Sequence, residues 1–128
     1  MSDFMSKINW TEILPDNCPP NDAVQPNNNE FYRLVNTNPP SFDDFLSSRQ
    51  VWPNKYFSKS ECVVRSISIF SRIENIYRIK KMLTHKDKFI AKIVLQNKDG
   101  VIKQTCADHD HYSWWRTREF NLNQCELL

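Results

Sequence analysis

Residues 88–105 read KFIAKIVLQNKDGVIKQT and carry the strongest strand signal in the chain. The segment 88–95 is rich in branched and aromatic residues, which are typical of strands. Asp99 and Gly100 form a dipeptide that favours a tight turn between two strands. We therefore expect residues 88–95 and 101–105 to form a hairpin, and the fold to contain a β-sheet.

The flanking sequence predicts further elements on both sides of this segment. Alternation of serine with apolar residues predicts a strand over 66–70, and aromatic and branched residues predict another over 31–35. Ser71 and Glu74 match a capping box that opens a helix ending near Thr84. Weaker signals predict a helix start near Ser41, a brief helix within 59–64, and late strands over 112–115 and 123–127.

This order of elements favours an α+β fold. We expect one compact domain over residues 31–128, with a small mixed or antiparallel sheet and two or three helices. Residues 1–30 are rich in Asn, Asp and Pro, and we expect them to form an irregular N-terminal arm. The chain has 128 residues, of which 40% are apolar, and this is enough for one hydrophobic core.

Composition excludes several classes of site. The only glycine is Gly100, whereas phosphate-binding loops of the Walker type and dinucleotide fingerprints need several glycines. The net charge of +2 is too small to indicate nucleic-acid binding by itself, although nucleic acid remains open as a target. A locally basic stretch covers residues 78–92, and we interpret it as the solvated face of a helix and the turn after it.

The sequence also predicts where the protein resides. It has no apolar run long enough to span a membrane and no apolar core of a signal peptide near its start, so we expect a cytoplasmic protein without membrane contact. The cysteines are far apart in the sequence and include no C-x-x-C pair. We therefore expect reduced thiols that act as small apolar side chains.

Arg33 lies in the middle of an apolar predicted strand, where a permanent charge is costly. It needs either an acidic partner or an anionic ligand. Acidic candidates are Asp43, Asp44 and Glu61, and a phosphate or pyrophosphate is the alternative, because guanidinium binds such oxygens through two parallel hydrogen bonds. Ser66 and Ser68 share one face of the strand 66–70 and turn their hydroxyls toward solvent or a cleft.

The segment 106–115 concentrates reactive side chains. His111 precedes a predicted strand and is the best-placed general acid or base, because imidazole exchanges protons near neutral pH. The simpler interpretation of His111 is a surface side chain paired with Asp110. A zinc-like ion is a minor alternative, with Cys106, His109 and His111 as ligands and Asp108 or Asp110 in support.

Trp114 and Trp115 are neighbours, so on a strand they point to opposite faces. Only one can face the main core. The other therefore packs on a second surface or lines a pocket, where an aromatic ring can stack on a base or a nicotinamide.

Together, these positions resemble the ADP-ribosyltransferase-like fold. The similarity lies in a strand carrying Tyr32-Arg33, a second strand reading Ser66-Ile67-Ser68-x-Phe70, the helix directly after it and a later hairpin. The resemblance implies that the protein binds NAD or an ADP-ribose-containing ligand. It implies that Arg33 binds the cofactor phosphate, that Ser66 and Ser68 support the nicotinamide ribose, and that Tyr112 or a tryptophan such as Trp114 forms the wall against the nicotinamide.

The sequence departs from the family at one catalytic position. Such transferases carry a late glutamate that holds the ribose and stabilises the oxocarbenium-like transition state, and no Glu-x-Glu or Gln-x-Glu motif occurs where the late strand should begin. His111 lies near that position, and Glu119 is the acidic residue shortly beyond. The candidate catalytic residues are therefore His111 and Glu119.

Two functional hypotheses follow. In the first, the protein is a small ADP-ribosyltransferase-like toxin or effector with a nucleotide ligand. In the second, it is a non-catalytic interaction protein, such as an antitoxin, immunity or defence accessory component, and the histidine segment, the tryptophans and the basic stretch form a surface for a protein partner. Convergence of Arg33, Ser66, Ser68 and His111 in one cleft would favour the first.

Overall fold

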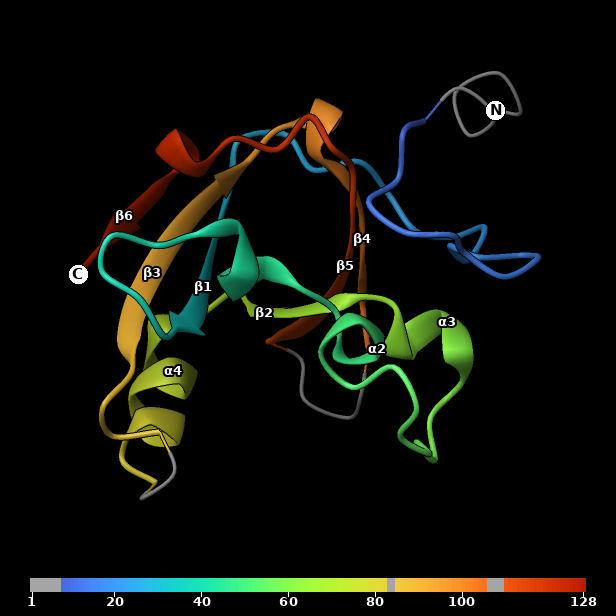
Figure 1. Ribbon diagram of the computed structural model, residues 1–128. Helices are drawn as coiled ribbons and strands as arrows, with labels where there is room; N and C mark the ends of the chain where they lie inside the picture. Colours follow the sequence, from blue (N-terminus) through green and yellow to red (C-terminus); the bar gives the residue numbers. More distant parts are fainter. Residues whose placement is uncertain (1–7, 83–84, 106–109) are drawn as a thin grey trace.

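The core of the fold is one antiparallel sheet. The computed structural model describes residues 8–82, 85–105 and 110–128. Within these residues the sheet has six strands in the spatial order β4-β5-β2-β1-β3-β6 (Figure 1). The strands are β1 (Asn29–Val35), β2 (Ile67–Phe70), β3 (Phe89–Leu95), β4 (Gly100–Gln104), β5 (His111–Arg116) and β6 (Cys125–Leu127).

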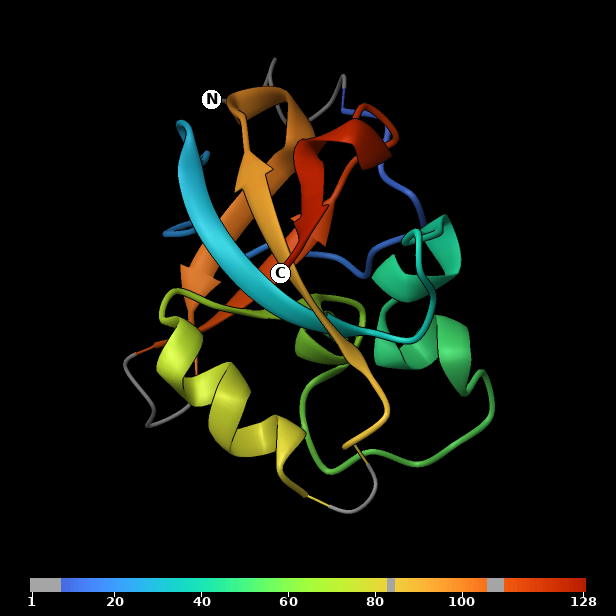
Figure 2. The same cartoon turned by 90° about the vertical axis from the view of Figure 1, so that its left-hand side faces the viewer.

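Short helices connect the strands and cover the sheet. The α-helices are α2 (Ser48–Val51), α3 (Glu61–Val64) and α4 (Ile73–Lys80), and the 3₁₀ turns are η1 (Phe42–Phe45), η2 (Asn97–Asp99) and η3 (Leu122–Gln124). α4 packs on β1 and β2 with Ile76 buried, and Figure 2 shows α4 below β1 in that view. The expectation of a small mixed α+β domain is confirmed, with the sheet as its larger part.

The predicted capping box at Ser71 does not form. α4 begins at Ile73, and Arg72 occupies the N-cap without a side-chain hydrogen bond. The Ser71 amide donates to the carbonyl of Asp110 at 2.8 Å, which ties the start of the helix to β5. The apolar spacing that predicted the helix was therefore informative, whereas the exact cap depended on a partner distant in sequence.

The predicted hairpin is wrong. β3 pairs with β1 and β6, whereas β4 pairs with β5, so the chain leaves one side of the sheet at Leu95 and re-enters at the opposite edge. Asp99 fixes the segment that connects β3 to β4. Its fully buried carboxylate accepts hydrogen bonds from the Gln96 amide and the Gln124 side chain, both at 2.7 Å. Gly100 follows with φ 130°, and a Cβ there would lie 1.9 Å from the Trp115 carbonyl oxygen.

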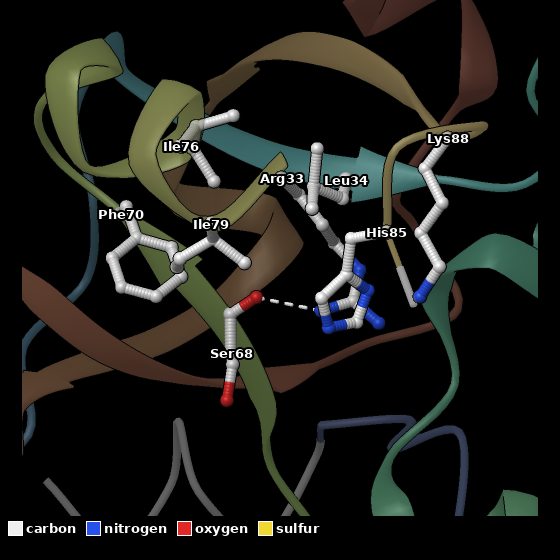
Figure 3. A pocket seen from close by; sticks show the side chains of 8 residues that line it. All are labelled: Arg33, Leu34, Ser68, Phe70, Ile76, Ile79, His85 and Lys88. Carbon is white, nitrogen blue, oxygen red and sulfur yellow. Dashed lines mark hydrogen bonds between the residues drawn. The ribbon is translucent and has the colours of Figure 1, made fainter. Parts of the chain in front are cut away.

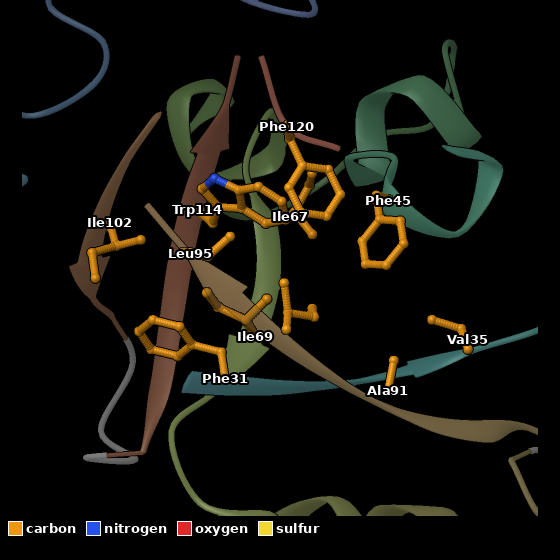
Figure 4. Packing of buried hydrophobic residues seen from close by; sticks show 11 residues of the cluster. Phe31, Val35, Phe45, Ile67, Ile69, Ala91, Leu95, Ile102, Trp114 and Phe120 are labelled. Carbon is orange, nitrogen blue, oxygen red and sulfur yellow. The ribbon is translucent and has the colours of Figure 1, made fainter. Parts of the chain in front are cut away.

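The sheet curls around its main hydrophobic core (Figure 4). Side chains from strands at both sides of the sheet meet there with phenylalanines from η1 and the segment before η3. The buried cluster consists of Phe31, Val35, Phe45, Ile67, Ile69, Ala91, Ile93, Leu95, Ile102, Trp114 and Phe120. Because β3 and β4 contribute to one core without pairing, apolar burial rather than a local turn decides their placement.

Both tryptophans of β5 are fully buried. Trp114 lies in the main core and donates its indole N–H to the Asp99 carbonyl at 3.0 Å. Trp115 points to the other face and donates to the Cys62 carbonyl in α3 at 2.9 Å. The second tryptophan therefore packs on a second surface, which was one of the two alternatives that the sequence left open.

The N-terminal arm is fastened to the sheet and to α3. Val24 forms a β-bridge with Ile102 at the edge of β4, and Cys18 forms a disulfide with Cys62. The prediction of reduced thiols is therefore wrong for this pair, because a distance of 44 residues in sequence did not reveal their proximity in space.

Cys125 is free, and burial raises the pKa of its thiol to about 12, so it stays protonated at neutral pH. Cys106 lies outside the described residues.

Among the described residues, no helix combines the length and the apolar character needed to cross a membrane.

Removing the disulfide is expected to destabilise the fold. The link closes a long loop, so the double variant Cys18→Ser with Cys62→Ser should lose about 2–4 kcal/mol of unfolding free energy through the larger entropy of the unfolded chain. Urea denaturation measures this loss. Reductant should lower the stability of the wild type and leave the double variant unchanged, and an equal response of both proteins would contradict the pairing.

Candidate functional site

Arg33 bridges a gap between two strands of the sheet. β1 and β2 are paired through a single residue pair, Tyr32 with Phe70, and no further pairs follow in the described strands. Where the ladder stops, Nη1 of Arg33 donates to the carbonyl of Ser68 at 2.6 Å, and Nε donates to the carbonyl of Asp44 at 2.9 Å. For the Ser68 carbonyl, the guanidinium therefore replaces the backbone donor that a continuous ladder would have supplied.

The environment of Arg33 is unusual for a cation. Burial lowers the pKa of Arg33 to about 10, although the nearby charge of Asp44 opposes this shift. The group still carries its charge at neutral pH. Its electrostatic partner among the predicted candidates is Asp44, since Glu61 forms ion pairs with Arg49 and Arg65 instead.

Asp44 is itself held by its surroundings. Burial raises the pKa of its carboxyl, but hydrogen bonds from Thr37, Ser41 and Asn36 and the charge of Arg33 outweigh this effect and leave the pKa below its usual value. The carboxylate accepts from the Asn36 amide at 2.7 Å and from the Ser41 amide at 3.0 Å. Asp44 thus organises the loop before η1, and the Arg33 guanidinium forms its hydrogen bonds with main-chain carbonyls instead.

His111 meets Ser68 from the neighbouring strand β5. Its Nε2 lies 3.1 Å from the Ser68 hydroxyl, and its Nδ1 lies 3.3 Å from the Thr105 carbonyl oxygen and 3.1 Å from the Thr105 hydroxyl. Because a carbonyl oxygen only accepts, its contact fits the tautomer with hydrogen on Nδ1, in which Nε2 accepts from the Ser68 hydroxyl. The Ser113 hydroxyl continues this network, at 2.8 Å from that of Thr105.

Ser68 lies at the boundary of two pockets. We call the first the cationic pocket, which Figure 3 shows and which is lined by Arg33, Leu34, Ser68, Phe70, Ile76, Ile79, His85 and Lys88. We call the second the serine pocket, lined by Ser48, Phe57, Ser58, Lys59, Val63, Val64, Ser66, Ser68, His111 and Ser113. The shared Ser68 makes them adjoining parts of one candidate site.

A third pocket adjoins the cationic one and shares Arg33, Leu34 and Lys88 with it. We call it the Trp52 pocket, lined by Arg33, Leu34, Asn36, Asp43, Asp44, Leu46, Ser48, Val51, Trp52 and Lys88.

Four of the residues singled out in the sequence meet around Ser68. Arg33 contacts its carbonyl, His111 contacts its hydroxyl, and Ser66 lines the serine pocket with both Ser68 and His111. The roles of the two serines differ, however. Ser68 is exposed, whereas Ser66 is buried and donates its hydroxyl to the Val63 carbonyl at 2.7 Å, which holds β2 against the end of α3.

Three other predicted residues lie elsewhere. Trp114 is enclosed by the core and offers no face to a ligand. Tyr112 turns to the same side and packs edge-on against Phe31, with ring centroids 5.3 Å apart. Glu119 lies beyond the opposite end of β5 from His111, and its carbonyl accepts from Lys98 at 3.0 Å. The structure therefore does not bring the expected aromatic wall or the late carboxylate to Ser68.

The sequence interpretation missed several lining residues. His85 and Lys88 belong to the basic stretch that was interpreted as a solvated helix face and the turn after it, yet both line the cationic pocket. Phe57 is the aromatic residue of the serine pocket, and it follows a loop that carries no recognisable motif. Ser113 was detectable in principle, because it pairs directly with Ser68 in the β2–β5 ladder and shares its face.

Most of the proposed metal ligands lie outside the described residues. Cys106, Asp108 and His109 lie outside the described part of the chain. Within the described residues, no group of three His, Cys, Asp or Glu side chains is placed to hold a metal ion. The side chain of Asp110 accepts a hydrogen bond from Asn75 at 2.6 Å, which ties β5 to α4.

Comparison with protein-family models, with curated protein sequences and with solved structures finds no match for this chain.

Arg33 should contribute to the stability of the fold as well as to the binding of any ligand. Arg33→Met keeps the apolar stem and leaves two carbonyls without their donor, so we expect a loss of about 2 kcal/mol in unfolding free energy. Urea denaturation measures it. Arg72→Met is the matched control, because Arg72 is largely exposed and its removal should cost less than about 0.5 kcal/mol. Equal stabilities of the two variants would contradict the bridging role.

Proposed function

We propose that the site around Ser68 binds NAD or another ADP-ribose-containing ligand, as the resemblance to the ADP-ribosyltransferase-like fold implies. One observation carries this proposal. The carbonyl of Ser68 accepts from Arg33 at 2.6 Å while its hydroxyl lies 3.1 Å from His111, so residues from β1, β2 and β5 meet at one exposed position. Pockets open on both sides of that position and can receive two chemically different parts of one ligand.

The two pockets suit different parts of a nucleotide. The cationic pocket offers the guanidinium of Arg33 for a phosphate, and guanidinium groups match phosphate oxygens well. The serine pocket offers hydroxyls and an imidazole, which are suitable donors and acceptors for the hydroxyls of a ribose. Phe57 provides an aromatic edge in the same pocket, where the sequence had expected Tyr112 or Trp114.

The chemistry available at this site depends on His111. The linings of the cationic and serine pockets contain no Asp or Glu among the described residues, and Glu119 is remote from them. The oxocarbenium-stabilising glutamate of the resembling transferases therefore has no counterpart in these linings. If transfer occurs, His111 is the group that accepts a proton from the Ser68 hydroxyl or from an acceptor molecule placed there.

A second candidate function rests on a different surface. Val51, Trp52 and Tyr56 in and after α2 have exposed fractions of 48%, 55% and 87%. Large apolar side chains gathered in one exposed segment are typical of protein contact surfaces. This observation favours a non-catalytic interaction protein, of the antitoxin, immunity or defence accessory kind. In the first proposal, the same surface would receive the target of a toxin or effector.

The compartment is also part of the proposal. A cytoplasmic location remains our prediction from the sequence. The Cys18–Cys62 disulfide bears on it, because disulfides persist mainly in oxidising compartments. A cytoplasmic protein would have to hold this pair oxidised against the reducing pool of thiols. The redox state of the pair in protein taken directly from cells therefore decides between the two compartments.

Calorimetric titration with NAD and with ADP-ribose tests the binding proposal. We expect saturable binding that Ser68→Ala weakens about 3- to 10-fold, the usual range for one lost hydrogen bond, and that Ser68→Phe abolishes by filling the boundary of the two pockets. Ser68 is exposed, so both variants should fold as the wild type does. Asn123→Ala, on the exposed surface of η3, serves as the control and should bind normally.

The absence of saturable binding to either nucleotide would contradict the proposal and favour the interaction protein. Equal affinity in wild type and Ser68→Phe would show that the nucleotide binds at another place. Release of nicotinamide from NAD, measured in parallel with His111→Asn, separates catalysis from binding alone.

A further inference from the structure

The cationic pocket gathers three basic side chains from separate parts of the chain. Arg33 comes from β1, whereas His85 and Lys88 come from the turn between α4 and β3. Figure 3 shows the His85 ring and the Arg33 guanidinium beside Ser68, the Lys88 amine on the far side of His85 in this view, and Phe70 and Ile79 toward the opposite side. Basic groups normally avoid such proximity, because like charges repel each other.

His85 carries an unsatisfied polar atom. Its Nδ1 is buried and has no hydrogen-bond partner within the described residues. Buried polar atoms nearly always have a partner, and an orphan usually indicates a water, an ion or a ligand at that place. The backbone holds the residue in position, because the His85 amide donates to Met82 at 2.9 Å and the Lys88 amide donates to His85 at 3.0 Å.

The acidic side chains nearest to these groups lie in the adjoining Trp52 pocket, where Asp43 and Asp44 share the lining with Arg33 and Lys88. The described lining of the cationic pocket includes no Asp or Glu, and Lys88 and His85 take part in none of the ion pairs of the described chain. Asp44, the acidic group that acts on Arg33, accepts hydrogen bonds from Asn36, Thr37 and Ser41. The pocket therefore keeps an excess of positive charge beside an apolar wall, where electrostatic attraction is stronger than in open water.

We propose that the cationic pocket is a phosphate subsite, in which His85 and Lys88 act together with Arg33. Arg33 has two main-chain bonds that fix its plane, and its Nη2 makes no hydrogen bond within the described part of the chain. The pocket volume of about 160 Å³ is below the roughly 300–1,000 Å³ of sites for drug-sized ligands, and it suits a phosphate group rather than a whole nucleotide.

This inference rests on the proposed function in one respect, which is that the phosphate belongs to an ADP-ribose-containing ligand. Binding of a simple phosphate needs the subsite alone. The inference also assigns a function to part of the basic stretch, which the sequence had suggested to be a solvated helix face and the turn after it. His85 and Lys88 would give the subsite its affinity, whereas Arg33 would also link the subsite to Ser68.

Calorimetric or NMR titration with inorganic phosphate and pyrophosphate, at constant ionic strength and with chloride as the reference anion, tests the subsite. We expect saturable binding that Lys88→Gln weakens about 10-fold, since it removes a positive charge, and that His85→Phe weakens about 3-fold or more, since it removes the imidazole donor. Lys81→Gln is the matched control. It removes an equal charge from an exposed position at the end of α4, outside the pocket lining, and should leave the affinity within about 2-fold.

The outcomes separate this inference from the proposed function. Phosphate binding that depends on Lys88, without binding of ADP-ribose, supports the subsite and contradicts the nucleotide proposal. ADP-ribose binding that Lys88→Gln and His85→Phe leave unchanged overturns the subsite and leaves the nucleotide proposal standing. Equal weakening by Lys88→Gln and Lys81→Gln shows only general charge attraction and also overturns the subsite. Thermal melting of each variant confirms that the compared proteins are folded.

Discussion

The structure depends on how Arg33 closes the gap where β1 and β2 part. The two strands share one residue pair, and beyond it the guanidinium joins the Ser68 carbonyl in β2 to the Asp44 carbonyl in η1. This bridge holds three segments that are distant in sequence around one exposed serine. It also places a permanent positive charge at the boundary of the pockets, so the interaction that stabilises the sheet creates the electrostatic character of the candidate site.

The sequence was a good guide to elements that bury an apolar face and a poor guide to their partners. The periodicity of 73–80 and the apolar runs of β1 and β3 identified a helix and two strands. The hairpin at Asp99 failed, because a buried carboxylate and a shared core can separate two strands that a turn dipeptide would join. The Cys18–Cys62 disulfide was missed for a similar reason, since proximity in space has no local signature.

The candidate site shows the same division. A charge inside an apolar strand singled out Arg33, and alternation singled out Ser68, because both signals arise from physical cost and geometry within one strand. His85 and Lys88 could not be separated from a solvated basic stretch, since only the fold turns them toward the pocket. Trp114 was misplaced because an aromatic residue beside a reactive histidine looks the same in sequence whether its ring lies in a pocket or in the core.

The central claim is that a phosphate-bearing nucleotide occupies the site around Ser68. Amide NMR spectra of the protein during titration with ADP-ribose test it most directly, because they locate the ligand on the fold without any substitution. We predict that the largest shifts fall in β2, at the start of β5 and at residues 85–88. Saturation without shifts at these places, or shifts confined to the region of Asp99 and η3 at the far end of β5, would contradict the account.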